Sequence, residues 1–153
     1  MLYYANYPYC TTIGSSAFED NDLLFISFPA CKSIHTNAFY GNSHLFDGQH
    51  GFGNSLYMRE VEWLSTGAFR YCSGFAEAIF PMLTQIYGYA FQGCTNLKDL
   101  YIGTSNCKLA RYGLTGCGIT TTTGWIHVPE YTDYSYKHSA YWSAYSSRIV
   151  DDY

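Results

Sequence analysis

Charge is scarce in this sequence. Its 153 residues include 8 Lys or Arg and 12 Asp or Glu, and this 13% is about half of the roughly 25% usual in soluble proteins. With so few basic residues and a net charge of −4, we expect no nucleic-acid partner, because such partners are held mainly by phosphate neutralisation.

Long apolar segments are absent as well. No apolar run approaches the roughly 18 residues that a membrane-spanning helix needs, so we expect no membrane insertion. The N-terminal Met1–Asn6 has neither the basic region nor the apolar stretch of a signal peptide, and we expect none. Aromatic residues, in contrast, make up 20% of the chain, with 17 tyrosines, which argues against disorder.

A repeat organises almost the whole chain. An aliphatic residue is followed five positions later by Phe or Leu in five pairs: Ile13/Phe18, Ile34/Phe39, Leu64/Phe69, Ile86/Phe91 and Leu109/Leu114. Successive Phe18-type positions are separated by 21, 30, 22 and 23 residues. The long interval indicates an inserted loop within residues 46–54, where Gly48, Gly51 and Gly53 lie. A fixed period of this length predicts a solenoid, in which each repeat buries its apolar face against its neighbours.

Six aligned segments read as short strands: Tyr4–Tyr7, Phe25–Phe28, Ser55–Met58, Glu77–Phe80, Asp99–Ile102 and Trp125–Val128. One alternate face of these segments is apolar, from Ala5 and Tyr7 to Ile126 and Val128, and we assign it to the core. The other face is mixed and is expected to be exposed. Together the segments predict one parallel sheet of about six strands.

Small polar residues stand three positions after each Phe18-type residue: Asn21, Asn42, Cys72, Cys94 and Cys117. We expect these side chains to point inward and bond to backbone groups of the turns. Cys10 and Cys31 occupy a second column. In-register neighbours do not favour disulfide geometry, so we expect these five cysteines to be free thiols. The state of Cys107, outside both columns, stays open.

The pattern Ile86-x4-Phe91-x2-Cys94-x2-Leu97-x2-Leu100-x-Ile102 resembles the BspA-like (Treponema pallidum-type) leucine-rich repeat family. The tail, with Val128-Pro129, Tyr134–Lys137 and Ala140–Trp142, also fits such arrays. The resemblance covers roughly residues 4–149. It implies a right-handed, mostly β solenoid with short helical turns over residues 1–129, and a helical C-terminal cap over residues 130–153.

The resemblance implies interaction and no enzymatic activity. Members of the family are mostly surface or secreted proteins of host-associated microbes, implicated in adhesion and protein binding, and related arrays occur in phage proteins. The expected location is therefore extracellular or at the cell surface, with a virion as the alternative.

The exposed strand face is the candidate binding site for a protein or a glycan, since exposed aromatic side chains suit recognition. The alternative is that aromatic residues are simply tolerated on a β surface. The candidate residues are Phe25, Tyr57, Ile79, Tyr101, Trp125, His127, Glu77 and Asp99.

Other chemistry finds little support. His44, Asp47 and His50 lie close together in sequence as potential metal ligands, but no fourth ligand is evident, so we expect neither metal nor cofactor. No cysteine has the flanking residues of a catalytic nucleophile.

The sequence also predicts how the two ends of the repeat array are covered or left open. At helical spacing Tyr134, His138, Tyr141, Trp142 and Tyr145 form one stripe that would cover the last repeat. The first strand, beginning at Tyr4, has no polar cap before it. An open edge of this kind invites another chain, so a self-associating subunit of a virion or surface appendage is the alternative function.

Overall fold

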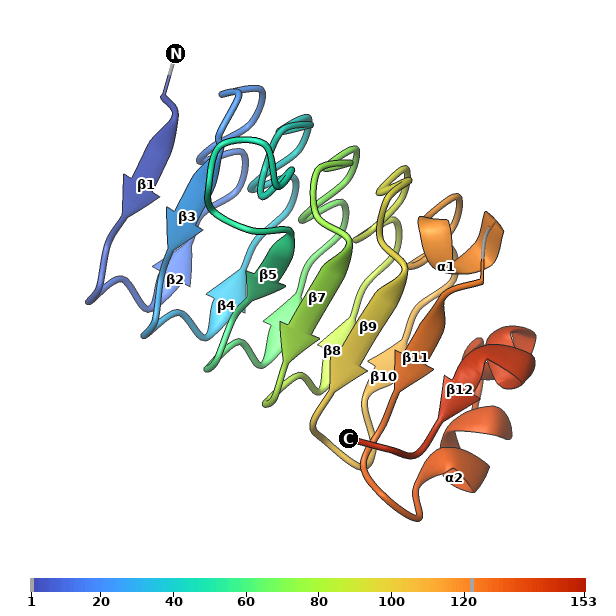
Figure 1. The fold of residues 1–153 in the computed structure, drawn as a ribbon. Coiled ribbons are helices and arrows are strands. Elements are labelled where there is room, and N and C mark those ends of the chain that lie inside the picture. The colour runs from blue at the N-terminus through green and yellow to red at the C-terminus, as the bar shows by residue number, and fades with distance from the viewer. Residues whose placement is uncertain (1, 122) are drawn as a thin grey trace.

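The computed structural model describes residues 2–121 and 123–153 as a stack of repeats, each making one circuit of the chain (Figure 1). The strands that face the viewer in Figure 1 are the six that the alternation predicts. They are β1 (Tyr4–Asn6), β3 (Phe25–Ser27), β5 (Ser55–Tyr57), β7 (Glu77–Phe80), β9 (Asp99–Ile102) and β11 (Trp125–His127). All pairings between them are parallel and in the expected register, so that Ile79 lies opposite Tyr101.

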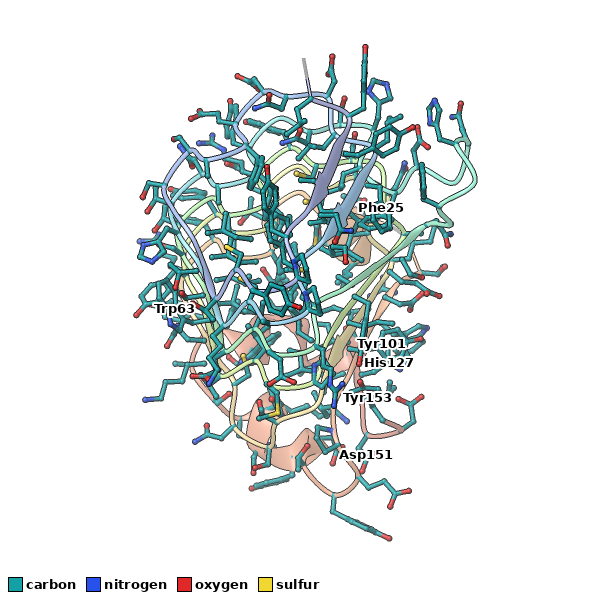
Figure 2. The ribbon with its side chains drawn as sticks, turned by 90° about the vertical axis from the view of Figure 1, so that its left-hand side faces the viewer. Phe25, Trp63, Tyr101, His127, Asp151 and Tyr153 are labelled. Atoms are coloured by element: carbon teal, nitrogen blue, oxygen red, sulfur yellow. The ribbon has the colours of Figure 1, made fainter. Side chains whose placement is uncertain are left out.

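The prediction of a single sheet is wrong. Behind these front strands a second parallel sheet contains β2 (Thr12–Ile13), β4 (Ser33–Ile34), β6 (Trp63–Leu64), β8 (Gln85–Ile86) and β10 (Lys108–Leu109). Each back strand has two residues, too few to show an alternation in the sequence. Trp63 on this back sheet and Tyr101 on the front lie on opposite sides of the molecule (Figure 2).

The front strands themselves form two sheets. The back sheet is continuous, and β4 pairs with β6. On the front, β1 pairs with β3 and β5 starts a separate sheet that continues through β7, β9 and β11. The inserted residues 46–54 lie between β3 and β5 in the chain, and Gly48, Gly51 and Gly53 all adopt positive φ there. The expected loop is therefore present, and the front sheet divides where it enters.

Five arcs join the back strands to the next front strands at the upper edge of Figure 1. They are residues 16–20, 37–41, 67–71, 89–93 and 112–116. The arcs also stack through the backbone: the Phe69 N–H donates to Ala90 O and the Phe91 N–H to Gly113 O, both at 2.9 Å. Phe18, Phe39, Phe69 and Phe91 stack inside them with nearly parallel rings 5.1–5.9 Å apart.

Asn42, Cys72 and Cys94, three members of the column of small polar residues, behave as expected. Asn42 is fully buried; its amide nitrogen donates to Phe18 O at 2.7 Å and its oxygen accepts the Leu23 N–H at 2.9 Å. In the following repeats the thiols replace this amide: Cys72 Sγ donates to Phe39 O at 2.9 Å and Cys94 Sγ to Phe69 O at 3.0 Å. All six cysteines are free thiols. The apolar strand face is buried except for Tyr7, which is half exposed on the first repeat.

The C-terminal segment contains α2 (Asp133–Lys137), the 3-10 helix η1 (Trp142–Arg148) and strand β12 (Ile149–Val150), which extends the front sheet beside β11. A short helix α1 (Gly118–Thr121) precedes β11. The predicted single stripe is wrong, because α2 ends at Lys137, η1 begins only at Trp142, and Tyr141 between them has a φ of 63°. Of the stripe, Trp142 is buried as expected and Tyr145 packs partly against the core, while Tyr134 and Tyr141 face solvent. Tyr136, outside the stripe, is buried as well.

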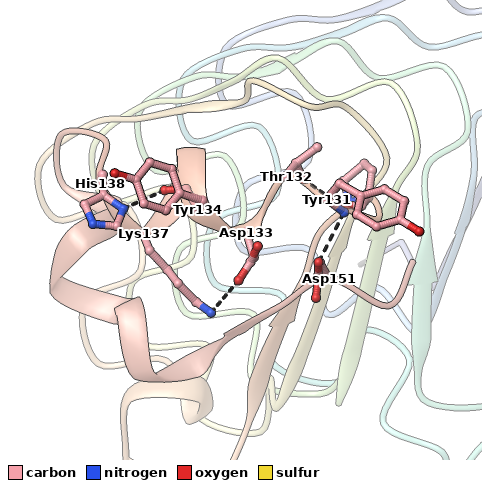
Figure 3. A network of polar contacts seen from close by, with 8 residues as sticks. Tyr131, Thr132, Asp133, Tyr134, Lys137, His138 and Asp151 are labelled. Carbon is pink, nitrogen blue, oxygen red and sulfur yellow. Dashed lines mark hydrogen bonds and ion pairs between the residues drawn. The ribbon is translucent and has the colours of Figure 1, made fainter.

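Hydrogen bonds fix this segment to the last repeats. The Tyr136 hydroxyl donates to Thr104 O at 2.6 Å and accepts the Cys107 N–H at 3.0 Å; burial raises its pKa to about 12. Trp142 Nε1 donates to Cys107 O at 2.7 Å. On the outer side Lys137 Nζ contacts Asp133 Oδ2 at 2.7 Å and the Tyr131 N–H donates to Asp151 Oδ2 (Figure 3).

Candidate functional site

All eight predicted binding residues lie on the outer face of the front strands, but their side chains differ in exposure to solvent. Tyr57 is 56% exposed and Trp125 is 41% exposed. The other six are half-buried: Phe25, Glu77, Ile79, Asp99, Tyr101 and His127. The structure places them in two groups, one at the division of the front sheet and one beside β12.

A cavity of about 480 Å³ lies at the division between β3 and β5. Phe25, Ser27 and Phe28 line it from the β3 side, and Ser55, Tyr57 and Arg59 from the β5 side. Phe46, at the start of the inserted loop, packs edge-to-face on Phe25 with ring centroids 5.4 Å apart. Phe52, near its end, lies against Phe25 at 5.0 Å. The loop thus contributes Phe46 to the cavity wall, and Phe52 supports Phe25 from the side.

Backbone polar groups also face this cavity. In a parallel ladder successive residues direct their N–H and C=O groups to opposite neighbours. The backbone groups of Phe25 and Ser27 bond to β1, so the N–H and C=O groups of Ile26 are directed toward β5. The N–H of Met58 bonds to β7, so the N–H and C=O groups of Ser55 and Tyr57 are directed toward β3. The cavity therefore combines aromatic side chains with strand groups that have no ladder partner.

The second group surrounds His127. Its Nδ1 lies 2.7 Å from Asp152 Oδ1 and its Nε2 lies 3.3 Å from Asp99 Oδ1. The imidazole stacks on the Tyr101 ring at 4.1 Å with an angle of 8°, and Tyr153 packs against the same tyrosine at 5.4 Å (Figure 2). Residues 152 and 153 thus cover part of the predicted binding face.

The pKa of Tyr101 reflects its position beneath residues 152 and 153. Burial, followed by the charges of Asp99, Glu77 and Asp152, raises the pKa of Tyr101. Glu77 accepts a hydrogen bond of 2.5 Å from the Ser55 hydroxyl, which ties β7 to β5 beside the cavity. Tyr101 is accordingly a packed residue here, and among the eight predicted residues the accessible aromatic side chains are Tyr57 and Trp125.

The inserted loop carries the weak metal candidates. Asp47 Oδ1 accepts the Gln49 N–H at 2.9 Å and lies 3.2 Å from His50 Nδ1, while His44 contacts Ser43. Although burial opposes it, these contacts hold the pKa of Asp47 below its ordinary value. Within residues 2–121 and 123–153, no three His, Cys, Asp or Glu side chains gather as metal ligands.

The thiols are poorly suited to nucleophilic chemistry. Burial raises the pKa of Cys31 and of Cys117 to about 11. It raises the pKa of Cys72, Cys94 and Cys107 further still. Because the thiolate is the reactive form, these five side chains serve packing and hydrogen bonding.

The order of elements, the columns and the strand register are consistent with a leucine-rich type of repeat. Residues 4–46 match a family model described as "BspA type Leucine rich repeat region (6 copies)". This part of the chain is a BspA-type leucine-rich repeat region. The later repeats keep the same strand register and the same arcs. No curated protein and no solved structure matches the chain.

BspA-type repeats are generally non-catalytic binding and adhesion modules, often associated with surfaces. In the part of the chain that the structure describes, no helix has the length and apolar character to cross a membrane.

Proposed function

We propose that this chain is a non-enzymatic protein-binding module whose contact site is the front face around the cavity between β3 and β5. The cavity carries this proposal, because it joins an accessible aromatic side chain, Tyr57, to backbone groups without a ladder partner. Extended peptide segments bind unpaired strand groups through their own main chain, with side chains in adjoining pockets.

A protein partner fits this site better than a glycan. Sugar recognition relies on aromatic faces and side-chain hydrogen bonds, whereas this site offers the main-chain groups of Ile26, Ser55 and Tyr57. Arg59 lies at one end and pairs with the neighbouring Glu60 at 3.3 Å, so it can also orient a polar group of the partner.

We further propose an extracellular or surface location, with a virion as the alternative. The buried thiols are compatible with an oxidising environment, because a raised thiol pKa leaves little thiolate to oxidise.

The experiment is selection of peptides from a random displayed library on the folded chain, followed by affinity measurements with variants. Tyr57→Ala should lower the affinity of selected peptides by about 1–3 kcal/mol, as expected for an aromatic side chain at the centre of an interface. The matched control is Tyr9→Ala, because Tyr9 is 91% exposed and lies outside the front face. Equal affinity of the two variants would remove the front face from consideration.

A separate observation supports the second candidate function, a self-associating subunit. At the β1/β2 end, Tyr7, Cys10, Ile13 and Phe18 line a pocket of about 200 Å³. Among the described residues, both strands have a partner on one side only. Light scattering over a range of concentrations tests it: a constant monomer mass contradicts assembly through this end.

A further inference from the structure

A second surface of unusual composition lies on the arcs, away from the front face. We call it the tyrosine–arginine surface, and it consists of Tyr40, Arg70, Tyr71, Tyr89, Arg111 and Tyr112. These residues come from four successive arcs or their borders, which stack through backbone hydrogen bonds. The surface is therefore built on rigid, regularly spaced backbone at the upper edge of Figure 1.

Arg70 is at its centre. Its guanidinium carbon lies 4.9 Å from the ring centroid of Tyr71, 5.6 Å from that of Tyr89 and 5.8 Å from that of Tyr40. Arg111 lies 4.6 Å from the centroid of Tyr112, whose ring stacks on Tyr89 at 5.3 Å. Cation–π contacts hold the two guanidinium groups in place without neutralising them.

Three of the tyrosines occupy backbone positions that disfavour them. Tyr71, Tyr89 and Tyr112 have φ values of 60°, 61° and 67°, in the left-handed region where a bulky residue is an outlier. At the equivalent positions the other arcs carry small residues: Ser16, Asn37, Gly67, Asp20, Gly41, Gly93 and Gly116. The backbone of the arc does not require tyrosine, so the tyrosine rings contribute contacts with Arg70 and Arg111 that the smaller residues cannot make.

Charge points to the nature of the ligand. Between Glu62 and Glu130 the sequence contains only two acidic residues, Glu77 and Asp99, and both begin front strands. Among the described residues, neither Arg70 nor Arg111 forms an ion pair. Arg70 Nε is also buried without a hydrogen-bond partner in the described part of the chain. Glu19 and Asp20 lie in the first arc, where the Asp20 N–H donates to Tyr40 O at 2.8 Å. From the third arc to the fifth, this is a local positive surface in a protein of net charge −4.

We propose that the tyrosine–arginine surface binds an acidic peptide segment of a partner protein, whose carboxylates pair with Arg70 and Arg111. Arginine binds carboxylates through paired, charge-assisted hydrogen bonds. The Tyr71 hydroxyl accepts a hydrogen bond from Arg70 at 3.3 Å and can still donate its own proton to the partner. This site is separate from the front-face cavity, and either can fail without the other.

The ring geometry favours a peptide over a sugar. A pyranose stacks on a free aromatic face, but Tyr112 has Arg111 and Tyr89 against it, and Tyr71 has Arg70 over it and packs edge-to-face with Tyr40. Tyr71, Tyr89 and Tyr112 are nevertheless 36–42% exposed, so part of each side chain is accessible beside these contacts. An extended segment advances about 3.3 Å per residue, so a few residues cross the roughly 10 Å that separate the third arc from the fifth.

The experiment measures fluorescence anisotropy of a rhodamine-labelled twelve-residue peptide of alternating Glu and Ser at low ionic strength, with a Gln–Ser peptide as the neutral comparison. The wild-type chain should bind the acidic peptide and not the neutral one. Arg70→Gln/Arg111→Gln should weaken binding by about tenfold or more, as expected when charge-assisted hydrogen bonds are lost. Added salt should weaken binding of the wild-type chain as well.

The matched control is Lys32→Gln/Arg148→Gln, which changes the net charge equally but lies elsewhere on the molecule. It should bind the acidic peptide like the wild-type chain. Arg111→Gln alone provides a milder variant, because Arg111 contacts one ring only, and circular dichroism verifies folding of each protein.

Several results overturn the proposal. These are absence of binding to the acidic peptide, equal binding of the neutral peptide, or equal losses in the two double variants. Arginine-dependent binding of a sialylated oligosaccharide without binding of the acidic peptide would assign the surface to glycans instead.

Discussion

The ring of Tyr71 occupies the space that a side chain on Gly93 would need. A Cβ on Gly93 would lie 2.3 Å from Cδ1 of Tyr71, and Gly93 has a φ of 73°. The two residues stand at the same position of adjacent arcs, so the bulky ring is possible only because the next arc carries glycine.

This relationship predicts the behaviour of Gly93→Ala. The substitution should lower the free energy of unfolding by about 1–3 kcal/mol, because it adds backbone strain and a clash with the ring. In combination with Tyr71→Gly the loss should be smaller than the sum of the single effects, since the clash is removed. Urea unfolding of the four proteins measures this coupling, and strict additivity would show that the ring does not lie there.

The phenylalanine column is expected to dominate stability. Phe91 is completely buried and lies 5.9 Å from Phe69 with parallel rings. Phe91→Ala should lower the free energy of unfolding by about 3–5 kcal/mol through the cavity it leaves. Tyr9→Ala, on an exposed side chain, should change it by less than about 0.5 kcal/mol. A loss below about 1 kcal/mol for Phe91→Ala contradicts the column.

The buried thiols predict a loss of stability at alkaline pH. The folded chain raises the pKa of Cys31 and Cys117 from the ordinary 9.0 to about 11. A pKa raised on folding means that the stabilisation is complete below the pKa of the unfolded thiol and is lost as pH rises through that of the folded one. The urea concentration at the midpoint of unfolding should therefore decrease as the pH is raised from 9 to 11. The decrease should be smaller in the Cys31→Ala/Cys117→Ala variant.

The same thiols should resist a thiol reagent in the folded chain and react after unfolding without reductant. Mass spectrometry that finds a Cys72–Cys94 or Cys94–Cys117 disulfide would overturn the column of free thiols.

The inserted loop is predicted to hold the front sheet open. Deletion of residues 47–53 should let β3 pair with β5, because the back strands β4 and β6 are already paired. The amide of Ile26, which faces the cavity, should exchange with solvent rapidly in the wild-type chain and slowly after the deletion. The deletion should leave unfolding free energy unchanged or raised while abolishing peptide binding. A slowly exchanging Ile26 amide in the wild-type chain would contradict the division.

The sequence predicted the front strands well, but it missed the back sheet and the break between the two C-terminal helices, for physical reasons. Three or four alternating residues such as Glu77–Phe80 identify a strand, and a repeat confirms its register. Back strands such as Gln85–Ile86 have no measurable period, although the aliphatic column already contained Ile86. The helical stripe failed because it assumed one continuous helix, whereas left-handed Tyr141 separates α2 from η1.

The candidate sites could be predicted only in part. Alternation placed Tyr57 and Trp125 on the surface, but nothing in the local pattern showed that residues 152 and 153 would return to cover Tyr101. The tyrosine–arginine surface was not predicted, because Tyr71 and Tyr89 lie outside the columns that repeat along the chain. The long stretch from 63 to 129 with only two acidic residues was the available signal.

The central claim is that a protein partner binds at the division of the front sheet, and NMR mapping tests it most directly. A peptide selected on the folded chain is titrated into the isotopically labelled 17.4 kDa protein, and backbone amide shifts are followed. We predict the largest changes at Ile26, Ser27, Tyr57 and Arg59, which line the cavity. Shifts confined to the back sheet or to the arcs, with these four amides unmoved, would contradict the claim.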